Sequence, residues 1–290
     1  MILDGKLYAA ELKNVLTKQC AALKETHGRA PSLHVLLIGS NPGSLVYVSM
    51  KQKRAQEFGI QSTVHRLDET IDKKTVLDIL HDLNKNPEVD GILVQLPLPP
   101  HLNANEIIDT ISPEKDVDGL TSINLGRLLR GTPSLVSCTP LGCMHILKQW
   151  RQDISGLNAV IVGRSTLVGK PLSLLLTHAN ATVTLCHSKT KNLEMHTKQA
   201  DILIAACGSP KLIRKEHVKP GACIIDVGMN RLTDGSLSGD VAFDEIVHIA
   251  DAITPVPFGV GPMTIAYLMA NTIQAMKSTH INLDLILQKI

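Results

Sequence analysis

The segment AVIVGRSTLVGKPLSLLL, residues 159–176, decides the fold class of this chain. Its apolar start has the length of a buried strand, the glycines that follow predict a tight turn, and the remainder has the apolar period of a helix. A strand, a glycine turn and a helix in this order present backbone N–H groups that can hold a phosphate. The segment therefore predicts a nucleotide-binding unit, with an ordinary turn between strand and helix as the alternative.

The glycine spacing in this segment narrows the class of nucleotide site. Five residues separate Gly163 from Gly169, so neither G-x-G-x-x-G nor the P-loop pattern is matched. Pro171 stands where a P-loop has its magnesium-binding hydroxyl. The sequence therefore disfavours a P-loop NTPase.

The next predicted strand, Thr182–Cys186, indicates which dinucleotide would fit. NAD-specific sites usually carry an Asp or Glu about 20 residues after the glycine turn, to bind the ribose hydroxyl. Here the strand is followed by His187, Ser188, Lys189 and Thr190, and Arg164 lies in the turn itself. This cationic, hydroxylated corner favours a 2′-phosphate and hence NADP, because a guanidinium offers a fork of donors to phosphate. The alternative is a solvated turn with ordinary charges.

Alternation of strands and helices extends over both halves of the chain. It predicts the α/β class, with parallel sheets and a Rossmann-like second half. The boundary is expected near Gly131 to Gly156, where the predicted helix Thr139–Arg151 bridges the halves. The predicted strands are Ser32–Gly39, Ser62–Leu67, Gly91–Leu96, Ala159–Val162, Thr182–Cys186, Ile202–Ala206 and Cys223–Val227.

Predicted helices connect these strands. The first half has helices at Ser44–Phe58, Lys74–Leu83 and near Asn105–Ile111, and the second half has helices after at least its first and third strands. The last segment, Ile265–Lys277, has helical period after the Pro/Gly-rich run Thr254–Thr264. It can return to either domain, and the sequence does not decide which.

Composition excludes several classes of function. The chain has 290 residues, 44% of them hydrophobic, and a net charge of +2, so it is a folded protein without a general polyanion-binding surface. Aromatic residues make up 2%, too few to stack the bases of a nucleic acid. The six cysteines are spread along the chain, and the N-terminus has no apolar stretch of signal-peptide length. We expect a cytoplasmic protein that binds neither nucleic acid nor membrane.

The first half carries the candidates for chemistry. Tyr47 and Lys51 lie four residues apart on a predicted helix, so they share one face. Gln95 interrupts an apolar strand, where a buried amide without a partner costs about 1–3 kcal/mol, so it should bond another group. In the run KDVDG, one of Asp116 and Asp118 can cap backbone N–H groups while the other faces a ligand. Taken singly, each of these residues is equally compatible with a structural role.

Two further features complete the candidate set. The run Pro255–Thr264 is too stiff and too poor in side chains for an ordinary linker, which favours backbone contact with a flat ligand. The 12 histidines have no metal-ligand spacing, and Cys138 with Cys143 is too little for zinc. No metal site is predicted.

Together these motifs resemble the bifunctional methylenetetrahydrofolate dehydrogenase/methenyltetrahydrofolate cyclohydrolase family over essentially the whole chain. The segments that carry the resemblance are GSNPGSLVYVSMKQKRAQEFGI, DGILVQLPLP, SPEKDVDG, VIVGRSTLVGKP, TVTLCHSKT, IIDVGMNR, GDV and ITPVPFGVGPMT. The resemblance implies two α/β domains with a cleft between them. The first would span residues 1–138, completed by the C-terminal helix at about 265–290, and the second, an NADP-binding domain, residues 139–264.

The resemblance also implies an activity and a set of site residues. The activity is oxidation of 5,10-methylenetetrahydrofolate by NADP, followed by hydrolysis of the methenyl product to 10-formyltetrahydrofolate, in a homodimer. The implied catalytic residues are Lys51, Tyr47, Gln95 and Asp118. The implied cofactor contacts are Gly163, Arg164, Ser165, Ser188 and Met229. The implied substrate contacts add Val94, Leu96, Pro255, Val256, Pro257, Gly259, Gly261 and Pro262.

One residue departs from the family pattern, and two other functions compete with the bifunctional one. The family usually shows two glycines after PVP, whereas here Phe258 precedes Gly259, and an aromatic there would narrow the folate site. A dehydrogenase without an efficient hydrolase step is one alternative. A catalytically silent folate- or nucleotide-binding protein is the other, although a silent binder has no need of all four candidate catalytic residues.

Overall fold

The computed structural model of the chain describes residues 1–277, which divide into two units. Within these residues, unit 1 comprises Met1–Ala10 and Thr139–Thr264, and unit 2 comprises Glu11–Cys138 and residues 265–277. Each unit contains a parallel β-sheet, which confirms the predicted α/β class. The predicted C-terminal helix reached to about residue 290, of which residues 278–290 lie outside the described part.

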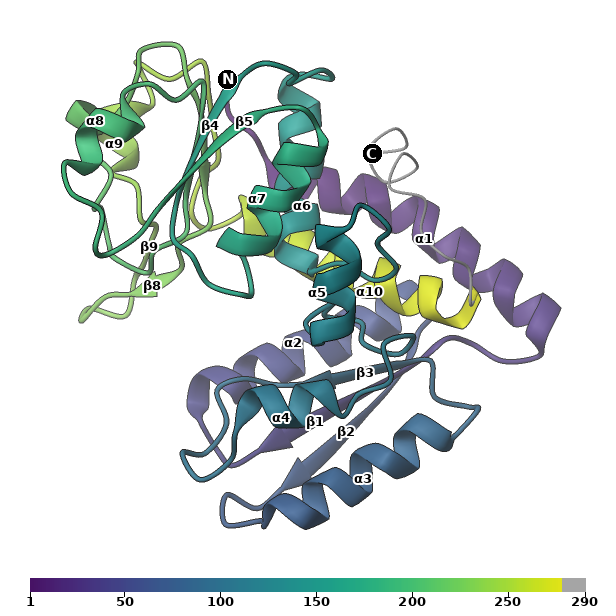
Figure 1. Cartoon of the computed structure of the whole chain (residues 1–290). Helices are drawn as coiled ribbons and strands as arrows, with labels where there is room; N and C mark the ends of the chain where they lie inside the picture. The colour runs from purple at the N-terminus through teal and green to yellow at the C-terminus, as the bar shows by residue number, and fades with distance from the viewer. Residues whose placement is uncertain (278–290) are drawn as a thin grey trace. The chain divides into compact units, whose positions relative to one another are not determined.

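Unit 2 is built on a three-stranded parallel sheet of order β2-β1-β3. The strands are β1 (Ser32–Ile38), β2 (Gln61–Leu67) and β3 (Gly91–Val94). Helices α2 (Pro42–Phe58) and α3 (Lys73–Lys85) cover opposite faces of the sheet (Figure 1). Val76, Leu80 and Leu83 of α3 pack on the apolar residues of β1 and β3 to form the core of this unit.

Helix α2 begins and ends where its sequence dictates. The side chain of Asn41 accepts a hydrogen bond from the backbone N–H of Ser44, and Pro42 occupies the first turn, where no N–H is needed. Gly59 ends the helix with a left-handed backbone, φ +81°. The helix that carries Tyr47 and Lys51 therefore has fixed ends.

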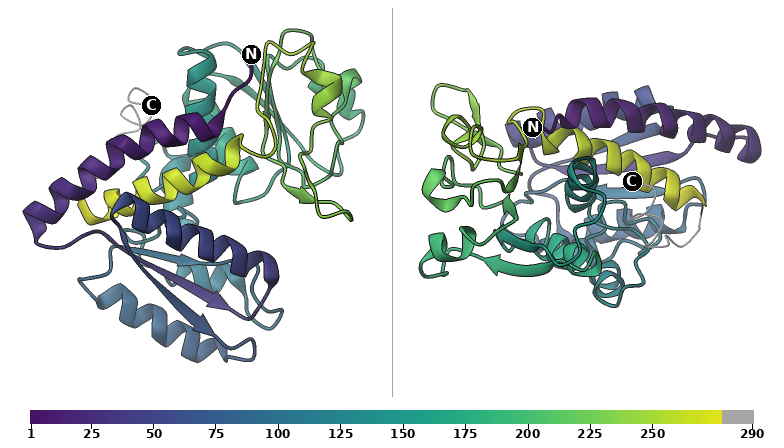
Figure 2. Two further views of the ribbon diagram at one scale, coloured as in Figure 1. Left: turned by 180° about the vertical axis from the view of Figure 1, so that it is seen from behind. Right: turned by 90° about the horizontal axis from the view of Figure 1, so that it is seen from above.

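Two long helices were not fully predicted. Helix α1 (Gly5–His27) was missed, and α10 (Val260–Lys277) begins inside the run that the sequence assigned to an irregular loop. The part of α1 after residue 11 and α10 run side by side (Figure 2), where Lys277 donates a hydrogen bond to Gln19. The shorter helices of unit 2 are α4 (Ala104–Asp109) and α5 (Ser122–Leu129).

Unit 1 has a five-stranded parallel sheet of order β10-β7-β6-β4-β5. The chain moves from β4 outward to β5 and then crosses to β6 on the other side of β4, so the strand order reverses at β4. In such sheets, ligands bind beyond the carboxyl ends of the strands at this reversal. The strands are β4 (Asn158–Val162), β5 (Thr182–Cys186), β6 (Ile202–Ala205), β7 (Cys223–Asp226) and β10 (Ala252–Ile253).

The first helix of unit 1 lies within one residue of the predicted helix Thr139–Arg151. The helices of this unit are α6 (Cys138–Trp150), α7 (Gly169–His178), α8 (Leu193–Thr197), α9 (Phe243–Ile246) and a 3-10 turn, Lys215–His217. The predicted helix after the third strand is wrong, because only the 3-10 turn lies between β6 and β7. That connection contains Pro210 and Pro220, which interrupt helices. A small antiparallel pair, β8 (Asn230–Arg231) and β9 (Leu237–Ser238), follows β7.

Residues 1–10 belong with unit 1, whereas the sequence placed them in the first domain. Ile2 forms a parallel bridge with Ile253, Leu3 donates to the Ile253 carbonyl, and Ile253 donates to the Met1 carbonyl. The N-terminus therefore extends the sheet beyond its edge strand β10. Within residues 1–277, no helix has the length and apolar character needed to cross a bilayer.

A histidine pair lies on the sheet of unit 2. His34 Nδ1 and His65 Nε2 are 2.9 Å apart, and the rings stack at 5.1 Å. Burial, together with the charges of His65 and Lys115, lowers the pKa of His34 to about 4, while Asp90 opposes the shift. Burial also lowers the pKa of His65. Both rings are therefore neutral at pH 7.

We expect this pair to make unit 2 sensitive to acid. The pKa of His34 in the folded state lies below its ordinary value of 6.5, so its stabilising contribution is present above pH 6.5 and is lost as the pH falls toward about 4. The loss is at most about 3 kcal/mol, since a difference of one in pKa corresponds to about 1.4 kcal/mol. Urea unfolding at a series of pH values measures it. His34→Asn should flatten the pH dependence, and the exposed control His81→Asn should not; equal slopes would contradict the assignment.

Candidate functional site

Lys51 and Gln95 meet in unit 2. Lys51 lies on α2, one turn after Tyr47, and its ammonium donates a hydrogen bond of 3.0 Å to Oε1 of Gln95. Gln95 directly follows β3, and α2 follows the neighbouring strand β1. Parallel pairing therefore brings the two side chains to the same edge of the sheet.

Gln95 is held in place through both its side chain and its backbone. Its Nε2 donates to the backbone carbonyl of Leu96 at 2.7 Å, and its backbone N–H donates to the Leu36 carbonyl at 2.9 Å. This arrangement leaves Oε1 to accept from Lys51 and so orients the ammonium. Tyr47 is 39% exposed, enough to offer its ring to a ligand, and partial burial raises the pKa of its hydroxyl.

Asp118 carries a carboxylate that has few partners. Burial raises its pKa; the charge of Lys51 opposes this shift, and the nearby Asp116 adds to it. Within residues 1–277, its hydrogen-bond partner is the Cys138 thiol, at the long distance of 3.8 Å. A desolvated carboxylate with only a weak donor beside it has unused acceptor capacity, which N–H groups of a ligand can fill.

The carboxylate of Asp116, in contrast, accepts hydrogen bonds from the chain itself. Its Oδ2 accepts from the backbone N–H of Thr121 at 2.8 Å and from the amide of Asn124 at 2.9 Å. The residue is 1% exposed. Asp116 is thus the structural carboxylate of the KDVDG run, and Asp118 is the one left for a ligand.

Asn271 of α10 fixes the position of this run. Its Nδ2 donates to the carbonyls of Val117 and Val136, each at 2.8 Å, and lies 3.6 Å from the Cys138 sulfur. Asn271 is 2% exposed. A single buried amide therefore ties the segment that carries Asp118 to the segment that carries its thiol partner.

In unit 1, Arg164 and Ser188 occupy equivalent positions beyond two paired strands. Val162 of β4 is in register with Cys186 of β5, and Arg164 and Ser188 each follow two residues later. Both are exposed. Their side chains can therefore reach one ligand beyond the sheet edge, as the predicted phosphate corner requires.

Gly163 makes the close approach in this corner possible. Its φ is +131°, and a Cβ there would lie 2.0 Å from the Ala206 carbonyl oxygen. A Cβ on Gly169 would in turn lie 1.9 Å from the Gly163 oxygen, so the turn admits only glycine at both positions. Ser165 lies between them, and its hydroxyl accepts from the Val168 N–H at 3.1 Å. The hydroxyl thereby occupies one N–H near the start of α7.

Two buried carboxylates that were not predicted shape the neighbouring loops. Asp226, at the end of β7, accepts from the backbone N–H groups of Gly228, Asp240 and Val241. Asp240 accepts from the N–H groups of Cys207, Gly208 and Ser209 and from the Asn230 amide. Burial raises the pKa of Asp226 to about 6, and its backbone donors oppose the shift. These two residues fix the loop that presents Met229.

The loop Pro255–Pro262 follows β10 at the same edge of the sheet. Its Gly261 packs against Met229, whose terminal methyl lies 3.1 Å from the position of an added Cβ. The predicted cofactor contact Met229 and the predicted substrate contact Gly261 are therefore neighbours within unit 1. Phe258 has a left-handed backbone, with φ +81°.

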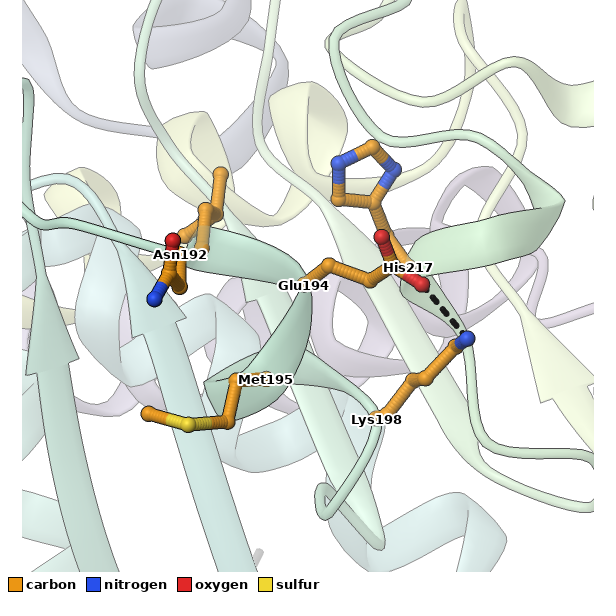
Figure 3. Close-up of a pocket in the computed structure, with 6 residues that line it drawn as sticks. Asn192, Glu194, Met195, Lys198 and His217 are labelled. Atoms are coloured by element: carbon orange, nitrogen blue, oxygen red, sulfur yellow. Dashed lines mark ion pairs between the residues drawn. The ribbon is translucent and has the colours of Figure 1, made fainter.

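A separate surface hollow contains none of the predicted site residues. It has a volume of about 550 Å³ and is lined by residues of α8 and the 3-10 turn, including an ion pair between Glu194 and Lys198 (Figure 3). The pair already neutralises the charges there. Within residues 1–277, no three His, Cys, Asp or Glu side chains group as metal ligands would.

Comparison with known proteins identifies the family. The tetrahydrofolate dehydrogenase/cyclohydrolase catalytic domain matches residues 3–118, and the NAD(P)-binding domain of the same family matches residues 137–280. The chain belongs to the tetrahydrofolate dehydrogenase/cyclohydrolase family. The match to the NAD(P)-binding domain covers the whole of the glycine turn and the sheet edge described above.

Relatives of this family are similar over nearly the full length. The bifunctional protein FolD of Campylobacter curvus is 47% identical over 98% of this chain and 99% of its own. The crystal structure of the Campylobacter jejuni enzyme superposes with a TM-score of 0.94 at 45% identity, covering 96% and 98% of the two chains. The Trypanosoma brucei enzyme, solved with NADP cofactor and an inhibitor, has a TM-score of 0.92 at 35% identity, covering 96% and 97%.

For this member of the tetrahydrofolate dehydrogenase/cyclohydrolase family, we expect Asn271→Leu to destabilise unit 2. Leucine leaves the buried carbonyl of Val136 without its amide donor and that of Val117 with the Cys138 thiol alone, at a cost of about 2–4 kcal/mol. The measurement is the free energy of unfolding in urea. The matched control is Asn14→Leu on the exposed side of α1, which should change little. If both variants were equally stable, the bracing role of Asn271 would be wrong.

Proposed function

We propose that this chain oxidises 5,10-methylenetetrahydrofolate to 5,10-methenyltetrahydrofolate with NADP and then hydrolyses the product to 10-formyltetrahydrofolate. Its family carries both activities in its name, and both domains of the family are matched. The observation that carries the proposal is the hydrogen bond between Lys51 and Gln95, which supplies an oriented proton-carrying group in the domain matched as catalytic.

The residues of unit 1 fit NADP. The N–H groups after Gly163 and the exposed Arg164 and Ser188 suit a phosphorylated nucleotide, and this corner of residues 163–165 and 187–190 contains no acidic side chain that would repel a phosphate. When bound, NADP accepts a hydride from the methylene carbon of the substrate. We assign its contacts to Gly163, Arg164, Ser165, Ser188 and Met229.

Hydrolysis of the methenyl product depends on proton transfer. Water attacks the methenyl carbon and loses one proton, and the bond from this carbon to the ring nitrogen then breaks as the remaining hydroxyl proton passes to that nitrogen, which leaves the formyl group on the other nitrogen. We assign the proton transfer to Lys51, with Gln95 positioning its ammonium through the 3.0 Å hydrogen bond. Both steps act on one carbon, so the protein orients the substrate once for both.

Asp118 and Tyr47 orient the reduced folate in this proposal. A pterin presents an amino group and a ring N–H side by side, which one carboxylate can accept together. Asp118 has the free acceptor capacity for this pair. The partly exposed Tyr47 ring can stack on the flat ring system.

Further substrate contacts are assigned to two backbone segments. Val94 and Leu96 flank Gln95, and the loop of Pro255, Val256, Pro257, Gly259, Gly261 and Pro262 offers a stiff backbone to the substrate and the nicotinamide. We also place the protein in the cytoplasm, since all six cysteines are free. The homodimer is proposed from the family resemblance.

The direct test is a coupled absorbance assay. Methylenetetrahydrofolate and NADP should give the absorbance of the methenyl product and NADPH, and the methenyl signal should then decay by hydrolysis faster than without protein. No turnover with either nicotinamide cofactor would refute the proposal. Turnover without accelerated decay would leave a dehydrogenase that lacks the hydrolase step.

Lys51→Met should abolish hydrolysis and leave folding intact. Proton transfer by a positioned side chain contributes about 100- to 10,000-fold, so methenyl hydrolysis should fall by at least about 100-fold. The measurement is decay of added methenyltetrahydrofolate. Lys53→Met, on the exposed face of the same helix, is the matched control and should retain the rate. An unchanged rate in the Lys51 variant would show that another group carries the proton.

Arg164→Ala should weaken NADP far more than NAD. Only NADP carries the 2′-phosphate, and a hydrogen bond to a charged group contributes about 1.5–3 kcal/mol, so we expect about a 10- to 100-fold rise in the KM for NADP. The KM for NAD should change little. Lys215→Ala, exposed on the 3-10 turn, serves as the control for loss of a surface charge. Equal losses for both cofactors would contradict the assignment.

A further inference from the structure

Phe258 adopts a backbone conformation that its side chain disfavours. Its φ of +81° lies in the left-handed region, which glycine enters freely and a bulky residue enters only with strain. At this position, directly after PVP, the family usually has glycine. Glycine would therefore satisfy the backbone here without strain.

The loop around Phe258 cannot relax to remove this strain. A Cβ on Gly5 would lie 1.7 Å from the Gly259 carbonyl oxygen, and a Cβ on Gly259 would lie 2.4 Å from the Pro255 oxygen. The backbone N–H of Lys6 also donates to the Phe258 carbonyl at 3.1 Å. The start of α1 and the loop are thus packed backbone to backbone, which fixes the φ of Phe258.

Packing does not compensate for the strain. The Phe258 side chain is 56% exposed, so burial of its ring contributes little to folding. The Lys6 ammonium lies over the ring, 5.5 Å from its centroid. An exposed cation–π pair contributes little to stability. The pair holds the ring in place without covering it.

We propose that Phe258 determines affinity for the reduced folate by stacking on the aminobenzoyl ring of the substrate. An exposed aromatic on a fixed and strained backbone is a preorganised surface for a flat ligand. This inference rests on the proposed function, and it adds a substrate contact at a position where a glycine could make none. Phe258 is a specificity residue, since it carries no proton and touches no reacting atom.

The position of Phe258 favours the folate over the cofactor. Phe258 follows β10, the outermost strand on one side of the sheet. Arg164 and Ser188 follow β4 and β5, on the other side of the sheet. Phe258 contacts Gly5 and Lys6 at the N-terminus. Met229, which we assign to the cofactor site, contacts Gly261 instead. Lys6 forms no ion pair with a carboxylate of residues 1–277, so its positive charge also suits the carboxylates of a folate tail.

Two variants of Phe258 test the inference. Phe258→Gly removes the ring and the strain, and Phe258→Tyr keeps a ring of the same shape. The KM for methylenetetrahydrofolate should rise about five-fold in Phe258→Gly, as expected for loss of an aromatic pair, and stay near the wild-type value in Phe258→Tyr. The KM for NADP and kcat should not change. The melting temperature of Phe258→Gly should equal or exceed that of the wild type, which shows that the variant folds.

Several results would overturn the inference. They are an unchanged or lowered folate KM in Phe258→Gly, an equal rise in the KM for NADP, or a tyrosine variant that behaves like the glycine variant. Wild-type turnover is measured first, so that turnover with an unchanged folate KM refutes this inference alone. If the wild type shows no turnover, binding of 5-formyltetrahydrofolate to the same three proteins is measured by calorimetry. Weaker binding by the glycine variant alone supports the contact between Phe258 and the folate. Equal binding by all three proteins, or no binding, refutes it.

Discussion

Parallel strand pairing is the constraint on which both candidate sites depend. In a parallel sheet, all carboxyl ends lie at one edge, so residues that follow different strands are brought together however far apart they lie in sequence. Register between β4 and β5 places Arg164 and Ser188 at equivalent positions beyond the strand ends, and pairing of β1 with β3 places Gln95 near the helix that carries Lys51. The chemistry is therefore located by backbone hydrogen bonds, and the side chains at these edges specify it.

The parts of the fold that were predicted from sequence are those with local causes. The strand β4, the glycine turn and α7 follow from an apolar run, two glycines and a helical period within residues 159–176. Helix α2 follows from its cap and its terminal glycine, so the shared face of Tyr47 and Lys51 could be predicted as well. The sequence also predicted that Gln95 has a hydrogen-bond partner, because a buried amide requires one.

The features that were missed depend on distant partners. Asn271 acts on carbonyls 135 and 154 residues away, and an Asn in a helix gives no local sign of this. Asp226 and Asp240 were quoted within motifs, but their roles depend on loops folding around them. The available signal for Asp226 was a carboxylate at the end of an apolar strand, two residues before a glycine. Helix α1 was missed because its apolar periodicity is weak and it contributes to both units.

Comparison with three buried carboxylates, those of Asp116, Asp226 and Asp240, shows why the partly buried Asp118 stands apart. Asp116, Asp226 and Asp240 each accept from two or more N–H donors that the chain itself provides, and these bonds offset the cost of removing a charge from water. Asp118 has a distant thiol and the charge of Lys51, and its pKa is raised by burial. Its desolvation is compensated only when a ligand brings the missing donors. The chain therefore keeps unused acceptor capacity at Asp118, close to the charge of Lys51, and a pair of N–H groups from a ligand would satisfy it.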